Sequence, residues 1–175
     1  MGPTLILIGF MGSGKTAAGK RVADDLGWEF YDTDLLVEQE VGASIIEIFE
    51  REGESAFRKA EELVIFHLLD EVISASAGTV LSLGGGAITI DNVYRRLLRE
   101  NLVVMLDEDI ETAFSRARNG KRPLGNDREA FGLLYAKRED LYRAVAKIVV
   151  QTRGKSIDQV AEEIVIQTSK RKDKG

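Results

Sequence analysis

Short apolar runs recur along the chain and alternate with longer stretches of helical periodicity. A short apolar run bounded by turn residues is typical of a strand that is buried on both faces of a sheet. The pattern predicts five strands, at residues 4–8, 29–32, 79–83, 102–106 and 146–150.

The stretches between these strands carry signals for helix starts and stops. Ser44 with Glu47, and Ser156 with Gln159, have the spacing of a capping box, which predicts a helix start at each site. Gly53 should break the first of these helices, because glycine is a poor helix former. The predicted helices cover residues 17–26, 44–51, 55–74, 91–101, 110–118, 128–143 and a last stretch after 156. Asp91 is expected to cap the helix over 91–101. The helix over 55–74 should carry an apolar stripe of Leu63, Phe66, Leu69 and Ile73.

Strands that alternate with helices indicate a parallel sheet covered on both faces. We therefore predict an α/β fold with three layers, α/β/α, around a five-stranded parallel sheet. No repeat or low-complexity linker divides the 175 residues, so the whole chain is expected to be one domain. Ligands of such sheets bind at the carboxyl ends of the strands.

The turn after the first predicted strand has the sequence of a phosphate-binding loop. Residues 9–16 read Gly-Phe-Met-Gly-Ser-Gly-Lys-Thr, which is the pattern G-x-x-x-x-G-K-[ST]. Its glycines let backbone N–H groups point at phosphate oxygens, and the helix that follows adds the positive end of its dipole. Lys15 is expected to stabilise the β- and γ-phosphates, and the Thr16 hydroxyl to hold Mg²⁺. The predicted nucleotide contacts are Gly12, Ser13, Gly14, Lys15, Thr16 and Ala17.

Two aspartates end the second predicted strand. Asp32 and Asp34 are two residues apart, and in an extended segment their side chains would face the same way. Beside a nucleotide–Mg²⁺ site, Asp32 is a candidate metal ligand. Asp34 is a candidate base that accepts the proton of the acceptor hydroxyl.

Asp107 follows a buried apolar run, as the acidic residue of a Walker B strand does. It could hold Mg²⁺. We favour a structural role instead, as the N-cap of the helix that starts near Ile110.

Three arginines and a run of glycines are candidates for acceptor binding. Arg58, Arg122 and Arg138 lie in three different predicted segments. Arginine suits bidentate carboxylate recognition and charge neutralisation in phosphoryl transfer. The glycines 84–86 follow a strand directly, where they allow close approach of a ligand to the backbone. The residues alone therefore indicate an ATP-dependent kinase for a small hydroxylated carboxylate.

Composition excludes several other classes of site. The chain has no cysteine and one histidine, His67, which rules out disulfides, a usual Ser-His-Asp triad and a multi-histidine zinc site. The net charge of −5 argues against nucleic-acid binding. No apolar run is long enough for a membrane span and no signal peptide is visible, so a cytoplasmic location is expected. The basic tail 170–175 is expected to be a solvated end.

At this point the sequence resembles the shikimate kinases, within the nucleoside-monophosphate-kinase-like P-loop fold, over nearly its whole length. The resemblance rests on residues 9–16, Asp32-Thr33-Asp34, Ile48-Phe49, residues 53–58, the glycines 84–86, Arg122-Pro123-Leu124, and Tyr135 with Arg138 and Tyr142. One departure is visible, because Gly125 stands where the family usually has a second leucine.

The resemblance implies phosphorylation of a shikimate hydroxyl by ATP with Mg²⁺, in aromatic amino-acid biosynthesis. It implies that Arg58 and Arg138 bind the shikimate carboxylate and Asp34 its hydroxyls, with a substrate-binding segment at about 33–62. Residues 119–127 would form a mobile lid that carries Arg122 to the phosphates. Arg153, with Arg118 or Arg116, would lie near adenine. The further substrate contacts are Gly84, Gly85 and Gly86, and a monomer is expected.

Two other functions are alternatives for a chain with this phosphate loop. Gluconate kinase shares the fold and a hydroxy-acid substrate, but it fits Arg58 and the three glycines less well. A nucleotide switch would usually carry Asn-Lys-x-Asp for guanine, and this tetrapeptide does not occur in the chain.

Overall fold

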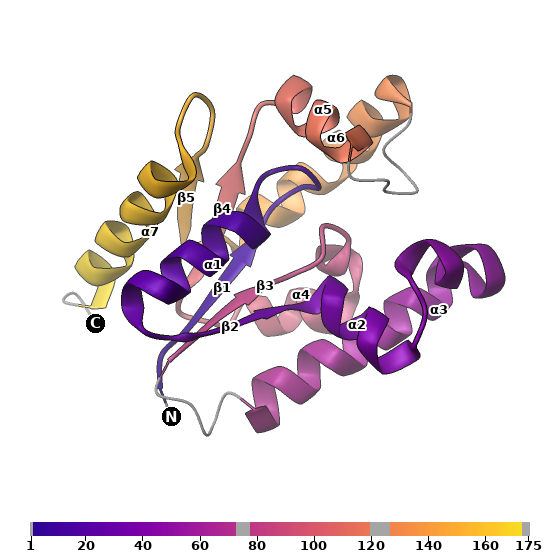
Figure 1. The fold of residues 1–175 in the computed structure, drawn as a ribbon, viewed down its shortest axis with the longest axis horizontal. Helices are drawn as coiled ribbons and strands as arrows, with labels where there is room; N and C mark the ends of the chain where they lie inside the picture. Colours follow the sequence, from indigo (N-terminus) through magenta and orange to yellow (C-terminus); the bar gives the residue numbers. More distant parts are fainter. Residues whose placement is uncertain (1, 73–77, 120–126, 173–175) are drawn as a thin grey trace.

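The computed structural model describes residues 2–72, 78–119 and 127–172. Five parallel strands form one sheet with the order β2-β3-β1-β4-β5 (Figure 1). The strands are β1 (Thr4–Ile8), β2 (Glu29–Asp32), β3 (Thr79–Ser82), β4 (Val103–Asp107) and β5 (Ile148–Gln151). The helices are α1 (Lys15–Leu26), α2 (Thr33–Val41), α3 (Ile45–His67), η1 (Leu68–Val72), η3 (Ala87–Thr89), α4 (Asp91–Leu97), α5 (Ile110–Asn119), α6 (Arg128–Val145) and α7 (Ile157–Lys172).

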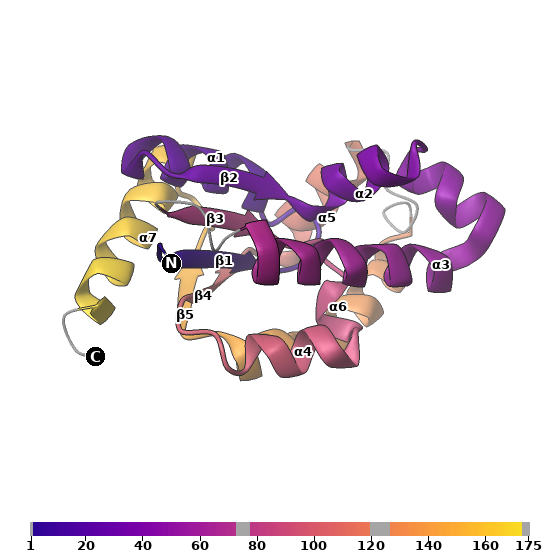
Figure 2. The same ribbon diagram turned by 90° about the horizontal axis from the view of Figure 1, so that it is seen from below.

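Alternate residues along β1 divide the core into two layers, because successive side chains of a strand point to opposite faces. Leu5 and Leu7 pack with α1 and α7 on one face. Ile6 and Ile8 pack with residues of α3, α4, α5 and α6 on the other. Figure 2 shows α1 and α7 on one side of the sheet and α4 and α6 on the other. The predicted three-layer α/β/α fold is confirmed.

The strand order brings the loops that carry the candidate site to one edge of the sheet. β1 lies in the centre and pairs with β3 on one side and β4 on the other. β2 lies beyond β3, with Asp32 opposite Ser82. The carboxyl ends of β1, β2 and β3 therefore lie side by side. As a result, the phosphate loop, the two aspartates and the three glycines are neighbours in space.

The long helix α3 has a break at the predicted place. Gly53 has φ 81° and ψ 171°, which lies outside the helical region and is open to glycine. The capping box of Ser44 and Glu47 is present at the start of the helix, with Glu47 N donating to Ser44 Oγ over 3.2 Å. The predicted apolar stripe is wrong at Leu63, which is 73% exposed, because Ile65 occupies the buried face instead.

Some boundaries differ from the prediction. Helix α2 was not predicted, and it starts directly after β2, so Asp34 lies in its first turn and not in an extended segment. The helix predicted over 91–101 ends at Leu97, and its N-cap residue is Ile90, with Asp91 in the first turn. The capping box of Ser156 and Gln159 is confirmed by both of its hydrogen bonds. Within the described ranges, no helix combines the length and apolar character that a membrane crossing needs.

Candidate active site

The phosphate loop joins β1 to α1 and depends on glycine for its path. Gly9, Gly12 and Gly14 all have positive φ, at 144°, 82° and 91°. A side chain at Gly12 would also collide with the carbonyl of Ala113, because the backbone of α5 lies directly against the loop. The loop is thus fixed from outside by α5, and Gly14 leads straight into the N-terminus of α1.

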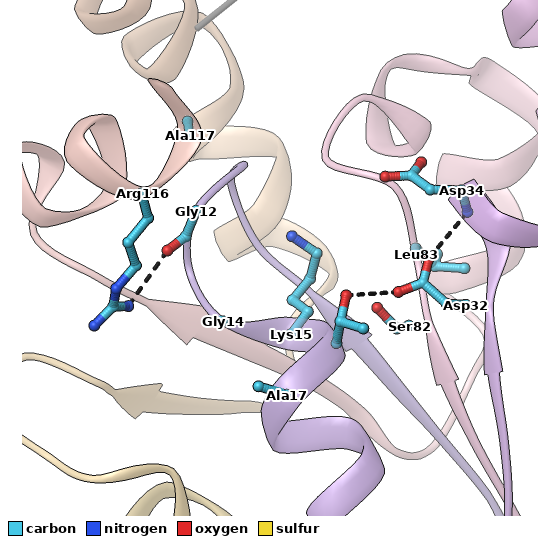
Figure 3. A pocket seen from close by; sticks show the side chains of 11 residues that line it. Gly12, Gly14, Lys15, Ala17, Asp32, Asp34, Ser82, Leu83, Arg116 and Ala117 are labelled. Atoms are coloured by element: carbon cyan, nitrogen blue, oxygen red, sulfur yellow. Dashed lines mark hydrogen bonds between the residues drawn. The ribbon is translucent and has the colours of Figure 1, made fainter. Parts of the chain in front are cut away.

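Lys15 and Thr16 lie at the start of α1, where the loop closes (Figure 3). The Lys15 ammonium is buried and donates to the carbonyls of Gly9 and Phe10, over 2.8 and 2.9 Å. The Thr16 hydroxyl donates to Asp32 Oδ2 over 2.6 Å. Asp32 also caps α2, because its Oδ1 accepts a hydrogen bond from the Asp34 amide over 3.1 Å.

A cavity of about 320 Å³ opens above the loop. It is bordered by the loop, by Asp32 of β2, by Asp34 of α2 and by Ser82 at the end of β3 (Figure 3). Its lining combines backbone N–H donors, one ammonium and two carboxylates, which suits a polyphosphate with a bound cation. The lining residues are Gly12, Gly14, Lys15, Thr16, Ala17, Asp32, Asp34, Ser82, Leu83, Arg116 and Ala117.

A second cavity of about 280 Å³ lies beside the first, between α1, α5 and the start of α7. Arg116 borders both cavities, and its Nη1 lies 3.4 Å from the carbonyl oxygen of Gly12. Arg118 and Arg153 are exposed and line neither cavity. The second cavity is lined by Ser13, Gly14, Ala17, Ala18, Glu108, Arg116, Thr152, Lys155, Ile157 and Val160.

The acceptor side of the site is built around the three glycines after β3. The Gly84 amide donates to Thr33 Oγ1 over 2.9 Å. A Cβ atom at Gly84 would collide with the carboxylates of both Glu61 and Asp34. The two acids therefore converge on the glycine backbone from α3 and α2, and only glycine leaves room for them.

Two arginines approach the same glycines from other helices. A Cβ atom at Gly86 would collide with the guanidinium of Arg58. Arg138, which is 4% exposed, donates from Nη1 to the Gly85 carbonyl over 3.3 Å, and the buried Tyr142 hydroxyl donates to the same oxygen. The fold thus brings Arg58, Arg138 and the glycines together, although they are far apart in sequence.

Electrostatics at these residues reflect their burial. Desolvation raises the pKa of Glu61 to about 7, although the positive charge of Arg58 opposes this shift. Burial favours the neutral form of Arg58, but the charge and hydrogen bond of Glu61 outweigh it and leave the pKa of Arg58 raised. The pKa of Arg138 is lowered, first by burial, while the positive charge of Arg58 acts in the same direction. The two guanidinium groups act on each other electrostatically, and together they favour the binding of an anion.

Asp107 does not cap α5 as predicted. It lies at the end of β4, and its carboxylate accepts hydrogen bonds from Arg143 Nη2 over 3.1 Å and Gln151 Nε2 over 2.6 Å. The Thr112 amide at the start of α5 instead donates to Asp109 Oδ1 over 3.0 Å. Asp107 therefore links α6 and β5 to the end of β4.

The sequence assigned no role to Glu61 or Glu108. Thr33 and Tyr142 were part of the family motifs but were not predicted to be site residues. Glu61 had a visible signal, because it lies one helical turn after Arg58. Arg122 and residues 120–126 of the expected lid lie outside the described residues. Among the residues that the structure does describe, no group of three or more His, Cys, Asp or Glu side chains could hold a metal ion.

Comparisons with known sequences give a consistent picture. The sequence model of the family described as shikimate kinase matches residues 11–169. A shikimate kinase of Moorella thermoacetica is 42% identical over 163 residues, which are 91% of each chain. One of Chromohalobacter salexigens is 39% identical and covers 98% of this chain and 94% of its own.

Solved structures agree. A structure described as shikimate kinase from Acinetobacter baumannii in complex with shikimate matches with a TM-score of 0.88 and 36% identity, covering 98% of this chain and 96% of its own. The shikimate kinase of Aquifex aeolicus matches with a TM-score of 0.80 and 31% identity, over 98% and 99% of the two chains.

Proposed function

Because the chain belongs to the shikimate kinase family, we propose that it transfers the γ-phosphoryl group of ATP to a hydroxyl of shikimate, giving shikimate 3-phosphate and ADP for aromatic biosynthesis. The observation that carries this proposal is the meeting of two half-sites at one sheet edge. One half-site is the phosphate loop, which follows β1. The other consists of Arg58 and Arg138, which lie against the glycines that follow β3.

On the nucleotide side, the loop amides would hold the phosphates and Lys15 would neutralise charge on the β- and γ-phosphates. The Lys15 ammonium already lies against the carbonyls of Gly9 and Phe10. Nucleotide binding would bring phosphate oxygens to this ammonium as charged acceptors.

On the acceptor side, Arg58 and Arg138 would bind the shikimate carboxylate. Their guanidinium groups lie close to Gly86 and Gly85, and the absence of a side chain at Gly86 leaves room for the guanidinium of Arg58. Asp34 borders the phosphate cavity and also approaches Gly84, so it lies between the two half-sites. This position suits a carboxylate that orients the acceptor hydroxyl and takes its proton.

Mg²⁺ would be held by the Thr16 hydroxyl and the Asp32 carboxylate. The two oxygens are 2.6 Å apart at the edge of the phosphate cavity, and oxygen ligands are those that Mg²⁺ prefers. The ion would supply charge neutralisation at the phosphates. Two protein oxygens leave the other positions to phosphate oxygens and water, as is usual for nucleotide-bound Mg²⁺.

Three further assignments belong to the proposal by family resemblance. Arg122, within a lid over 119–127, would contact the transferring phosphoryl group. Arg118 and Arg153 would lie near the nucleoside end, although Arg116 has the better position because it borders both cavities. The proposal places the protein in the cytoplasm, where ATP is supplied. It also includes a monomeric state and a single domain.

A coupled assay for ADP release tests the function directly. With purified protein, ATP and Mg²⁺, we expect turnover with shikimate and none above background with gluconate. Mass spectrometry should find a monophosphate of shikimate. Turnover with gluconate alone would reassign the substrate, and acceptor-independent hydrolysis of GTP would reassign the protein to the nucleotide switches.

A further inference from the structure

Glu108 is a buried acid at the nucleoside end of the site with no role in the proposed chemistry. It follows β4 and precedes α5, and its side chain is 2% exposed. One carboxylate oxygen, Oε2, accepts a hydrogen bond from Arg116 Nη1 over 2.8 Å. The other, Oε1, accepts one from the Asp109 amide over 3.0 Å. A carboxylate is costly to bury, so its position calls for an explanation.

Arg116 is the partner that Glu108 holds. Its side chain is 50% exposed, yet its guanidinium lies at the carbonyl of Gly12 and borders both cavities. Figure 3 shows this side chain beside the phosphate loop, with its contact to Gly12. Arg116 therefore stands where the triphosphate cavity passes into the second one.

We propose that Glu108 is a positioning residue for nucleotide binding: it fixes the Arg116 guanidinium across the junction of the two cavities, where that group contacts the nucleoside of ATP. This inference rests on the proposed function, since it assigns the second cavity to the nucleoside. A planar guanidinium stacks well on a purine, but only when its plane is held in place.

The geometry favours positioning over direct reading of the base. Each oxygen of Glu108 already accepts a hydrogen bond, from Arg116 and from the Asp109 amide. A free half-exposed arginine would sample many rotamers, and its ordering would cost binding free energy. The buried carboxylate removes that cost before the nucleotide arrives. Glu108 should therefore affect every purine nucleotide equally.

The main test measures the Kd of ADP with Mg²⁺ by isothermal titration calorimetry, without an acceptor. Glu108→Gln keeps the shape but removes the charge, and we expect ADP affinity to fall about tenfold, the size of one lost charge-assisted hydrogen bond. At saturating ATP, kcat and the KM for shikimate should stay within about twofold. Glu111→Gln is the matched control, because Glu111 lies on α5 but pairs with Arg128 at the surface.

A double-variant cycle distinguishes positioning from general damage. If Glu108 acts through Arg116, Glu108→Gln with Arg116→Gln should bind ADP as weakly as Arg116→Gln alone. Independent, multiplying losses would overturn the proposal, and so would unchanged ADP affinity in Glu108→Gln. A loss of ADP affinity without a similar loss for GDP would also overturn it, since the base would then be read directly.

If Glu108→Gln does not fold, Arg116→Lys decides, because the half-exposed Arg116 can change without loss of core packing. Lysine keeps the charge but not the planar fork, so weaker ADP binding supports the proposal and normal binding overturns it. These binding measurements need no acceptor. Failure to phosphorylate shikimate would therefore reject the proposed function, while the role of Glu108 in ADP binding would still be decided by calorimetry.

Discussion

The carboxylate of Glu61, with no exposed side-chain surface, accepts a hydrogen bond of 2.5 Å from the guanidinium of Arg58, three residues earlier on α3. Arg58 is also held by the exposed Glu54, over 3.0 Å. The buried pair gives the guanidinium its direction towards Gly86, because the outer partner is free to move with solvent. We therefore expect Glu61 to orient Arg58 for the binding of the acceptor carboxylate.

Glu61→Gln should raise the KM for shikimate about tenfold while the KM for ATP changes less than about twofold. Glutamine keeps one acceptor oxygen but loses the charge that holds Arg58 at pH values above about 7, so the assay is run above that pH. Steady-state kinetics with each substrate varied in turn provide the measurement. Glu62→Gln is the control, since its carboxylate bonds Asn92 at the surface. Equal weakening of both substrates would contradict the assignment.

Stability should depend on pH through Glu61. Its pKa is raised from 4.5 to about 7 on folding, so the folded state prefers the neutral acid. The stability that this preference gives is complete below about pH 4.5 and is lost as pH rises to about 7. Relative to Glu61→Gln, the wild-type free energy of unfolding should therefore fall over this range and then level off. Urea denaturation at several pH values measures it, and parallel curves for the two proteins would refute it.

Lys15→Ala should fold normally and lose at least about 10²-fold in kcat, as expected when about 3 kcal/mol of transition-state stabilisation disappears. The fold should survive because the carbonyls of Gly9 and Phe10, to which Lys15 donates, belong to its own loop. Lys20→Ala, at an exposed position of the same helix, is the control. Circular dichroism and a coupled ADP assay together give the answer, and near-normal turnover would remove Lys15 from the mechanism.

Asp34→Asn tests the assignment of the base. Asparagine has the same shape but cannot accept the proton of the acceptor hydroxyl, so we expect kcat to fall about 10²–10⁴-fold. The acidic limb of the pH–rate profile should also disappear. A smaller loss that appears partly in KM, with the limb retained, would make Asp34 a residue that only orients the hydroxyl.

Gly86→Ala should weaken acceptor binding by steric displacement of Arg58. Gly86 has φ −102°, which alanine can adopt, so the effect comes from the collision of the new methyl group with the guanidinium. We expect kcat/KM for shikimate to fall about tenfold or more, since a misplaced binding group has effects of this size. Gly132→Ala on α6 is the control, because its Cβ would lie 3.0 Å from the guanidinium of Arg128, a flexible side chain. Similar losses in both variants would argue against a specific role.

Local patterns predicted the features that depend on local physics. The apolar runs, the break at Gly53 and the capping boxes at Ser44 and Ser156 all depend on neighbours within a few residues. The phosphate loop was recognised in the same way, from glycines in its own sequence that adopt positive φ, although α5 also packs against it. These predictions needed no knowledge of the rest of the fold.

The remaining features depend on which distant segments meet. The burial of Ile65 in place of Leu63 is decided by how α3 is rotated against the sheet. Asp107 is used by Arg143 and Gln151, which reach it only after α6 and β5 are placed. The contact between Glu108 and Arg116 spans eight residues and a change from loop to helix, a spacing with no sequence signature.

The central position of β1 also has a consequence for the synthesis of the protein. The strand β1, which carries the phosphate loop, is synthesised before the other four strands, yet its two neighbours are β3 and β4, the latter ending at Asp107. Until β3 is synthesised, the apolar run of residues 4–8 has no strand to pair with, and its other side stays unpaired until β4 follows. We therefore expect the nascent chain to expose an aggregation-prone segment until β3 and β4 have both been synthesised, and to gain nucleotide affinity only after that.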